Sequence, residues 1–152
     1  MVVGVISDTH GVLSRQALEA LEGVQHIIHA GDIGNPDIIK TLEKIAPLTA
    51  VRGNMDSGVW SNRLPAFEMI TLNQSCFYIL HNLDRLDLEP QSAGIDIVIS
   101  GHTHFPEIKS VNQVLYFNPG SASSSRYGGP LAIGKIRLFK TYLEPEIIQL
   151  TI

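Results

Sequence analysis

Seven side chains of the kinds that bind metal ions follow apolar, strand-like runs in this chain of 152 residues. They are Asp8, His10, Asp32, Asn54, His81, His102 and His104. In α/β folds the carboxyl ends of the strands form the edge of the sheet where ligands bind. Carboxylate, amide and imidazole groups without thiolate suit divalent ions such as Mn, Fe, Zn, Ni or Mg. The pattern therefore predicts a metal centre at one edge of a sheet.

The spacing within these motifs supports the same interpretation. Residues two apart on an extended segment point to the same side, so Asp8 and His10 could bind one cation. His102 and His104 have the same spacing. Asp32 carries two carboxylate oxygens and could bridge two cations. Each motif is weak evidence by itself, and the set gains its specificity from its repeated position after strand-like runs.

The first half of the chain alternates predicted strands and helices. The strand Val2–Ile6 precedes a helix with Ser14 as its expected N-cap, and Gln25–Ala30 forms the next strand. A second helix is predicted to begin at Asn35-Pro36 and to end before Pro47. Strands that alternate with helices favour a parallel sheet with right-handed crossovers.

The second half contains three predicted β-hairpins, each with two strand-like runs around a short turn. Their turns are expected at Asn73-Gln74, Asn112-Gln113 and Lys140-Thr141. Together with the alternating first half, the hairpins indicate two sheets packed face to face with helices outside. We expect residues 1–152 to form a single domain.

Composition narrows the function classes. The net charge of −4, with 15 acidic and 11 basic residues, argues against binding to duplex nucleic acid. The sequence holds no apolar stretch of about 18 residues, so no membrane span is expected. The apolar segment Met1–Ile6 is interpreted as a strand rather than a signal peptide. Cys76 is the only cysteine, which excludes an internal disulfide and favours a cytoplasmic location. A homo-oligomer is possible, and the sequence does not decide it.

The order of the motifs resembles that of a known family. Asp-x-His, Gly-Asp, Gly-Asn-x-Asp, His and Gly-His-Thr-His occur in the order typical of the calcineurin-like metallophosphoesterase superfamily. The string Asn118-Pro119-Gly120-Ser121, with Ser123 and Arg126 beyond it, is similar to its small single-domain prokaryotic phosphodiesterase branch. The resemblance implies a four-layer α/β/β/α sandwich of two mixed sheets, with the metal centre at the strand ends.

The resemblance also implies a division of the ligands between two divalent metal ions. One ion would be held by Asp8, His10, Asp32 and His104, and the other by Asp32, Asn54, His81 and His102. A hydroxide shared by two cations about 3.5–4 Å apart would attack phosphorus in a small phosphodiester, with nucleotide-derived diesters as one candidate class. Asn54 and Arg126 are expected to contact the substrate, with the fixing of the glycine-rich loop through a carboxylate as the alternative role for Arg126. From the family, Mn is the expected metal in vitro, with Fe, Zn, Ni or Mg also possible.

Two other functions fit the same motifs. A non-catalytic scaffold could keep this fold, because a fold alone does not establish turnover. The complete ligand set favours an enzyme, since Asp8 and Asp32 would repel each other without a bound cation. A phosphomonoesterase would use the same metal ligands, so the ligands do not separate it from a phosphodiesterase.

Some residues depart from the family pattern, and others allow two interpretations. Met55 stands where many members carry a histidine that protonates the leaving group, so substrates with good leaving groups are expected. Gly53 is expected to permit an unusual backbone turn before the asparagine that follows it. Asp56 either orients a neighbouring loop or lies in a surface turn. His29 either supports the metal ligands or is simply a buried strand residue. Phe67 either packs or helps to line a base-stacking surface.

Overall fold

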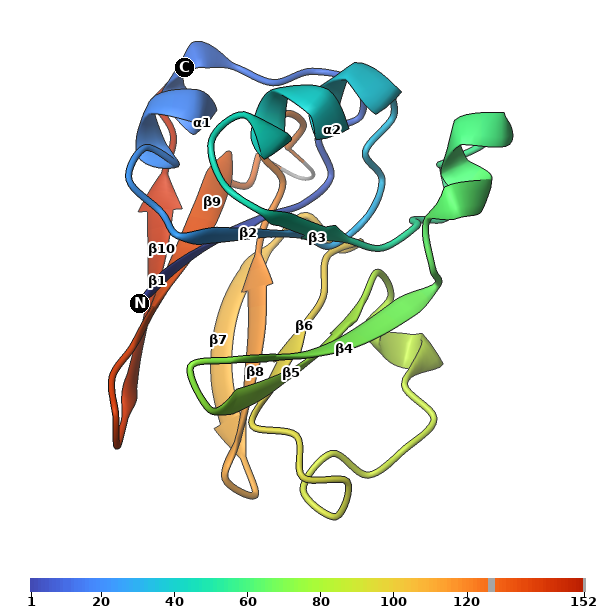
Figure 1. Ribbon diagram of the computed structural model, residues 1–152. Coiled ribbons are helices and arrows are strands. Elements are labelled where there is room, and N and C mark those ends of the chain that lie inside the picture. Colours follow the sequence, from blue (N-terminus) through green and yellow to red (C-terminus); the bar gives the residue numbers. More distant parts are fainter. Residues whose placement is uncertain (126–127, 152) are drawn as a thin grey trace.

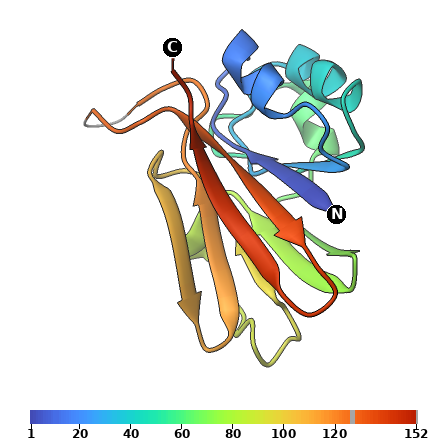
Figure 2. The ribbon, with the colours of Figure 1, turned by 90° about the vertical axis from the view of Figure 1, so that its left-hand side faces the viewer.

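The computed structural model of the protein describes residues 1–125 and 128–151. Two five-stranded sheets pack against each other, as Figures 1 and 2 show. The first sheet has the strand order β10-β9-β1-β2-β3, with bounds Leu143–Gln149, Ala132–Leu138, Val2–Ile6, His26–His29 and Leu48–Ala50. The second has the order β4-β5-β6-β8-β7, with bounds Phe67–Leu72, Ser75–Leu80, Ile97–Ile99, Val114–Pro119 and Pro106–Val111.

The alternating first half of the chain forms the parallel part of the first sheet, as predicted. β1 pairs in parallel with β2, and β2 with β3. The helices α1 (Arg15–Ala20) and α2 (Pro36–Glu43) connect these strands and cover the outer face of the sheet (Figure 1). The Ser14 side chain accepts a hydrogen bond from the Ala17 N–H, and the Asn35 side chain accepts one from the Asp37 N–H. Both expected N-caps are therefore present.

The three predicted hairpins are also present: β4 pairs with β5, β7 with β8 and β9 with β10, all antiparallel. The two-residue turns Asn73-Gln74 and Asn112-Gln113 have positive φ at both positions, from 47° to 71°. This is the geometry of a type I′ turn, whose twist matches that of the flanking strands. Asparagine tolerates it best among residues other than glycine, which explains why these turns form without a glycine.

The outer face of the second sheet is covered by a 3₁₀ helix and a loop rather than by an α-helix. The segment between β5 and β6 contains the 3₁₀ helix η2 (Leu83–Arg85) and a loop in which Leu86, Leu88 and Ile95 pack toward that face. The two sheets and the helical layer over the first one match the expected sandwich. In the fourth layer the cover is the 3₁₀ helix and a loop, because this segment is short and Pro90 disrupts a longer helix.

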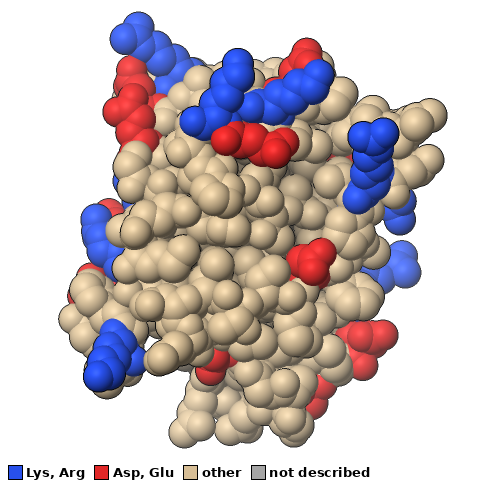
Figure 3. Space-filling view, viewed as in Figure 1, with Lys and Arg blue, Asp and Glu red and all other residues tan. Residues whose placement is uncertain are grey.

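Apolar clusters hold the layers together. Phe77 and Phe117 of the second sheet are fully buried against Val3, Val5 and Ile136 of the first. In the part of the chain that the structure describes, no helix is long and apolar enough to cross a membrane. On the face shown in Figure 3, Lys and Arg side chains lie scattered among Asp and Glu around a largely uncharged centre.

Candidate metal centre

The carboxyl ends of parallel strands from both sheets meet at one edge of the sandwich. The first sheet supplies Asp8 and His10 after β1, Asp32 after β2 and Asn54 after β3. The second sheet supplies His81 after β5, and His102 and His104 after β6. Each sheet alone therefore carries only part of the set, and the packing of the two sheets brings the side chains together.

One oxygen of Asp8 lies at the centre of the group. Its Oδ1 atom is 3.3 Å from His104 Nε2, 3.7 Å from His10 Nε2 and 3.9 Å from His81 Nε2. Its Oδ2 atom accepts hydrogen bonds from Ser7 Oγ at 2.6 Å and from the His102 N–H at 3.0 Å. Oδ1 is buried and has no hydrogen-bond partner among the described residues. A buried carboxylate oxygen in that condition is costly unless a cation binds it.

Asp32 lies between the two ends of the group. Its Oδ2 atom is 3.2 Å from His81 Nε2 and 3.8 Å from His10 Nε2, while its Oδ1 atom accepts the Met55 N–H at 2.8 Å. Burial by itself would raise the pKa of the Asp32 carboxyl, but the His81 ring and the Met55 N–H outweigh it and lower that pKa. Asp32 is therefore held in its ionised form, the form that binds a metal ion.

Backbone carbonyls fix the orientation of two of the histidine rings. Nδ1 of His81 donates to the Ala30 carbonyl at 2.7 Å, and Nδ1 of His104 donates to the Ser124 carbonyl at 3.0 Å. In the neutral ring each Nε2 then carries a lone pair and faces a carboxylate. His81 Nε2 is buried and has no hydrogen-bond partner among the described residues. Such an arrangement fits a divalent cation between the ring nitrogens and the carboxylates.

Two three-residue groups have ligand atoms within 4.8 Å of one another: Asp8 with His10 and His104, and Asp8 with Asp32 and His81. Asn54 and His102 extend the second group. Asn54 Oδ1 is 3.2 Å from His102 Nδ1, and the His102 ring lies 5.2 Å from the His81 ring, centroid to centroid. The structure thus brings all seven predicted side chains to one place, with donors for two adjacent ions.

The backbone at this edge has an unusual conformation that the sequence did not reveal. Five of the seven residues have φ between 47° and 72°, namely Asp8, His10, Asp32, His102 and His104. Residues other than glycine rarely adopt this left-handed region, and such strain costs about 1–3 kcal/mol per residue. Hydrogen bonds between loops stabilise it, among them the Asp8 N–H to the Gly31 carbonyl at 3.0 Å. Serines also contribute: Ser123 Oγ donates to the carbonyls of Asp8 at 3.0 Å and Thr9 at 2.6 Å.

Two glycines are needed for close approach rather than for conformational freedom. A Cβ atom on Gly101 would lie 2.0 Å from Ser7 Oγ and 2.7 Å from Asp8 Oδ2. A Cβ atom on Gly53 would lie 2.1 Å from Asp32 Oδ1. Gly53 begins a turn that the Asp56 N–H closes on the Gly53 carbonyl at 3.2 Å, but its φ is not positive. The glycine is needed there because it leaves room for a carboxylate.

Asp56 connects two of the ligand loops. Its Oδ1 atom accepts the Gly34 N–H and its Oδ2 atom accepts the Gly53 N–H, each at 2.9 Å. The side chain is buried, so the loop-orienting interpretation is correct and the surface turn is wrong. Met55 next to it is 64% exposed. The sequence signal for Asp56 was the Gly-Asn-x-Asp motif itself.

His29 supports the turn that contains Asp8. Its Nδ1 atom accepts the Gly31 N–H at 3.1 Å, so its Nε2 atom carries the proton and donates to Thr9 Oγ1 at 3.0 Å. Burial lowers the pKa of His29 to about 3, which keeps the ring neutral. His29 is thus a buried strand residue, and its ring binds the segments next to Asp32 and Asp8, while a supporting role toward a metal stays a prediction. Arg126, the other expected substrate contact, lies outside the described residues.

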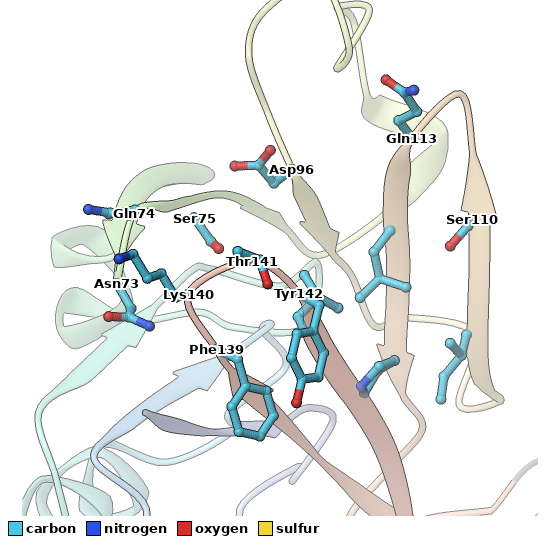
Figure 4. A pocket seen from close by; sticks show the side chains of 14 residues that line it. Asn73, Gln74, Ser75, Asp96, Ser110, Gln113, Phe139, Lys140, Thr141 and Tyr142 are labelled. Carbon is cyan, nitrogen blue, oxygen red and sulfur yellow. The ribbon is translucent and has the colours of Figure 1, made fainter.

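A cavity of about 520 Å³ lies at the other end of the sandwich (Figure 4). Its walls come from the three hairpin turns and include Asn73, Gln113, Phe139 and Tyr142. None of the seven clustered side chains lines it. The chemistry is therefore expected at the opposite edge of the sheets.

Comparisons with known proteins agree with this geometry. The family model for the calcineurin-like phosphoesterase superfamily domain matches residues 1–137. A probable metallophosphoesterase from Methanothermobacter thermautotrophicus is 34% identical over an alignment that covers 98% of this chain and 92% of that protein. A phosphodiesterase from Methanocaldococcus jannaschii is 32% identical, with 86% of this chain and 89% of that protein covered. A solved archaeal phosphodiesterase matches with a TM-score of 0.82 at 28% identity, over 97% of this chain and 100% of that one.

Proposed function

The chain belongs to the calcineurin-like phosphoesterase superfamily, and from this premise we propose that it is a metal-dependent phosphodiesterase acting on small phosphodiesters. One observation carries the proposal. The Oδ1 atom of Asp8 and the Nε2 atom of His81 are buried, face each other at 3.9 Å and have no hydrogen-bond partner among the described residues. A protein interior rarely leaves such groups without a hydrogen bond unless a ligand satisfies them.

We assign the seven side chains to two adjacent divalent ions. One ion would be held by Asp8, His10, Asp32 and His104, and the other by Asp32, Asn54, His81 and His102. The position of Asp32 Oδ2, near both His81 and His10, supports a bridging role. Mn is the metal we propose to test first, since the donor set would also accept Fe, Zn, Ni or Mg.

When bound, two such cations lower the pKa of a coordinated water and neutralise phosphoryl oxygens. The residues of the chain do the rest. The carbonyls that hold His81 and His104 keep the lone pairs of the rings directed inward. The Met55 N–H and the Ser7 hydroxyl each bind one carboxylate oxygen, which leaves the other oxygen free for a metal. The ligands are thus positioned before any substrate arrives.

The absence of a proton donor at position 55 sets the expected leaving group. The Met55 side chain is exposed and cannot transfer a proton. General acid catalysis typically contributes about 10²–10⁴-fold, so alkoxide leaving groups are expected to react slowly. We therefore propose that aryl and other activated phosphodiesters are cleaved much faster than simple alkyl ones.

Metal analysis and hydrolysis, measured on the same sample, test this function. We expect two Mn²⁺ ions per wild-type chain after desalting, at most one for Asp32→Ala, and the wild-type number for the exposed control Asp37→Ala. The loaded protein should hydrolyse bis(p-nitrophenyl) phosphate faster than p-nitrophenyl phosphate. Hydrolysis of the monoester alone would indicate a phosphomonoesterase. Two bound ions without turnover of either ester would indicate a non-catalytic scaffold.

We also propose a cytoplasmic location, because the single cysteine permits no internal disulfide. We propose as well that residues 1–152 form a single domain.

A further inference from the structure

A cavity of about 420 Å³ adjoins the metal-binding edge. Asn54 and His81 line this cavity, and its other lining residues include Phe67, Tyr78, Arg52 and Arg85. Its volume lies within the range typical of small-molecule pockets, about 300–1,000 Å³. Because it shares two side chains with the metal group, one arm of a phosphodiester bound there could extend into it. We call this cavity the arginine pocket.

An aromatic platform lines the arginine pocket. Phe67 is 58% exposed and stacks on Tyr78, with ring centroids 5.5 Å apart and planes 14° from parallel. Tyr78 is buried beneath it, so the orientation of Phe67 is supported from below. An exposed ring held in this way can stack with a planar ring of a ligand, as aromatic side chains do with bases in single-stranded nucleic acid binding.

Two cationic side chains line the same pocket. Arg52 lies in the loop after β3, and Arg85 is the last residue of η2, so two segments far apart in the sequence contribute one arginine each. The backbone N–H of Arg52 donates to the Pro65 carbonyl at 2.8 Å, and that of Arg85 donates to the Asn82 carbonyl at 3.0 Å. Among the described residues neither guanidinium has an ion-pair or hydrogen-bond partner.

This local charge differs from that of the chain as a whole. The protein carries a net charge of −4, and the arginine pocket combines two unpaired guanidinium groups with one acid, Asp87. Guanidinium groups bind phosphate and carboxylate in a planar, two-point geometry, and each such contact is stronger than a neutral hydrogen bond. The chemistry of the pocket thus matches a planar ring combined with a negative group.

We propose that the arginine pocket selects the substrate: Phe67 stacks on an aromatic ring of one ester arm, and Arg52 and Arg85 bind a second anionic group on that arm. The preferred substrate class is then a nucleotide-like phosphodiester that carries an additional phosphate beyond the one attacked. This inference rests on the proposed phosphodiesterase function, whose substrate it specifies. Arg52, Arg85 and Phe67 are specificity determinants and take no part in the bond-breaking step.

A matched pair of substrates isolates the second anion. Thymidine 5′-(p-nitrophenyl phosphate) and its 3′-phosphorylated derivative release the same p-nitrophenolate and differ only in the added phosphate. With the Mn²⁺-loaded protein, we expect kcat/KM to be about tenfold higher for the 3′-phosphorylated compound, the size of one charge-assisted contact. In Arg52→Gln and Arg85→Gln the ratio should fall toward one. Arg63→Gln removes an exposed arginine outside the pocket and should keep the wild-type ratio.

A second pair isolates the ring. Methyl p-nitrophenyl phosphate has no aromatic ring on its remaining arm, so Phe67→Leu should lower kcat/KM for thymidine 5′-(p-nitrophenyl phosphate) several-fold more than for the methyl ester. A wild-type ratio near one for the first pair, or ratios unchanged in both arginine variants, would overturn the inference while turnover itself upheld the proposed function.

If no diester is hydrolysed, the proposed function is refuted. A binding measurement then tests the inference about the arginine pocket by itself. Calorimetric titration with thymidine 3′,5′-bisphosphate should give about tenfold weaker affinity for Arg52→Gln and Arg85→Gln than for the wild type and Arg63→Gln. Equal affinities in all four proteins would overturn the inference independently of turnover.

Discussion

Replacing Asp56 with alanine removes the carboxylate that joins the loop of Asp32 to the loop of Asn54. The wild-type carboxylate accepts one N–H from each loop, Gly34 and Gly53, both at 2.9 Å, and is only 8% exposed. Hydrogen bonds to a charged group contribute about 1.5–3 kcal/mol each. Because water can reach the partly buried Gly34 N–H, we expect the variant to lose about 2–4 kcal/mol of unfolding free energy rather than the full sum.

Urea unfolding of the metal-free protein measures this loss. A typical stability of about 5–15 kcal/mol leaves most of the variant folded at 25 °C, so its metal affinity can be measured too. Asp56 positions the loops that carry Asp32 and Asn54, but it is not one of the proposed ligands. Mn²⁺ affinity should therefore fall about 10–100-fold, as is usual when a hydrogen bond that supports a ligand is removed. Calorimetric titration with Mn²⁺ detects a change of this size.

Asp96→Ala is the matched control. Asp96 Oδ2 also accepts a backbone N–H, that of Cys76 at 2.8 Å, but the side chain is exposed and lines the cavity at the other end of the sandwich. The Asp96→Ala substitution should lower the unfolding free energy by about 1 kcal/mol or less and leave the Mn²⁺ affinity unchanged. The reasoning would be refuted if Asp56→Ala lost less unfolding free energy than Asp96→Ala, or if its Mn²⁺ affinity equalled that of the wild type.

Two further predictions concern pH and leaving groups. Burial lowers the pKa of His29 from its usual 6.5 to about 3, so between these values only the unfolded chain binds a proton there. Stability should therefore fall as pH drops from about 6.5, by up to about 1.4 kcal/mol per pH unit from this residue, and urea titrations should show a shallower fall for His29→Gln; equal slopes would contradict this. Met55→Ala keeps the N–H that binds Asp32 and should change aryl diester hydrolysis less than about twofold, while Met55→His should speed alkyl diester hydrolysis at least about tenfold by supplying a proton donor. A steep loss of activity in the alanine variant would show that the side chain takes part in the reaction.

The sequence was sufficient for the family and for most of the fold. The alternation of apolar runs and capping residues predicted the parallel strands β1 and β2 and the helices α1 and α2, and these predictions are confirmed. The hairpins were predictable because their turns interrupt alternating runs at fixed positions. Family membership followed from the order of motifs around Asp8, Asp32 and His102, because side-chain type and spacing are read directly from a chain.

The outer layer of the second sheet was only partly predictable. Apolar residues such as Leu86 and Leu88 cover a sheet face equally well from a loop or from a helix, so their presence did not determine the secondary structure. The role of Asp56 was open for a similar reason. Its partners, the N–H groups of Gly34 and Gly53, belong to loops that approach each other only in the folded chain.

The sequence by itself determined which groups are available for chemistry and which strands they follow. The tertiary structure alone decided that Asp8 Oδ1 lies 3.3 Å from His104 Nε2, although the two residues are far apart in the chain. It also decided that five of the seven side chains stand on left-handed backbone. Local sequence encodes turns, caps and burial through contacts between near neighbours. Distances across two sheets, and the strain that the surrounding loops can hold, depend on how all the layers pack at once.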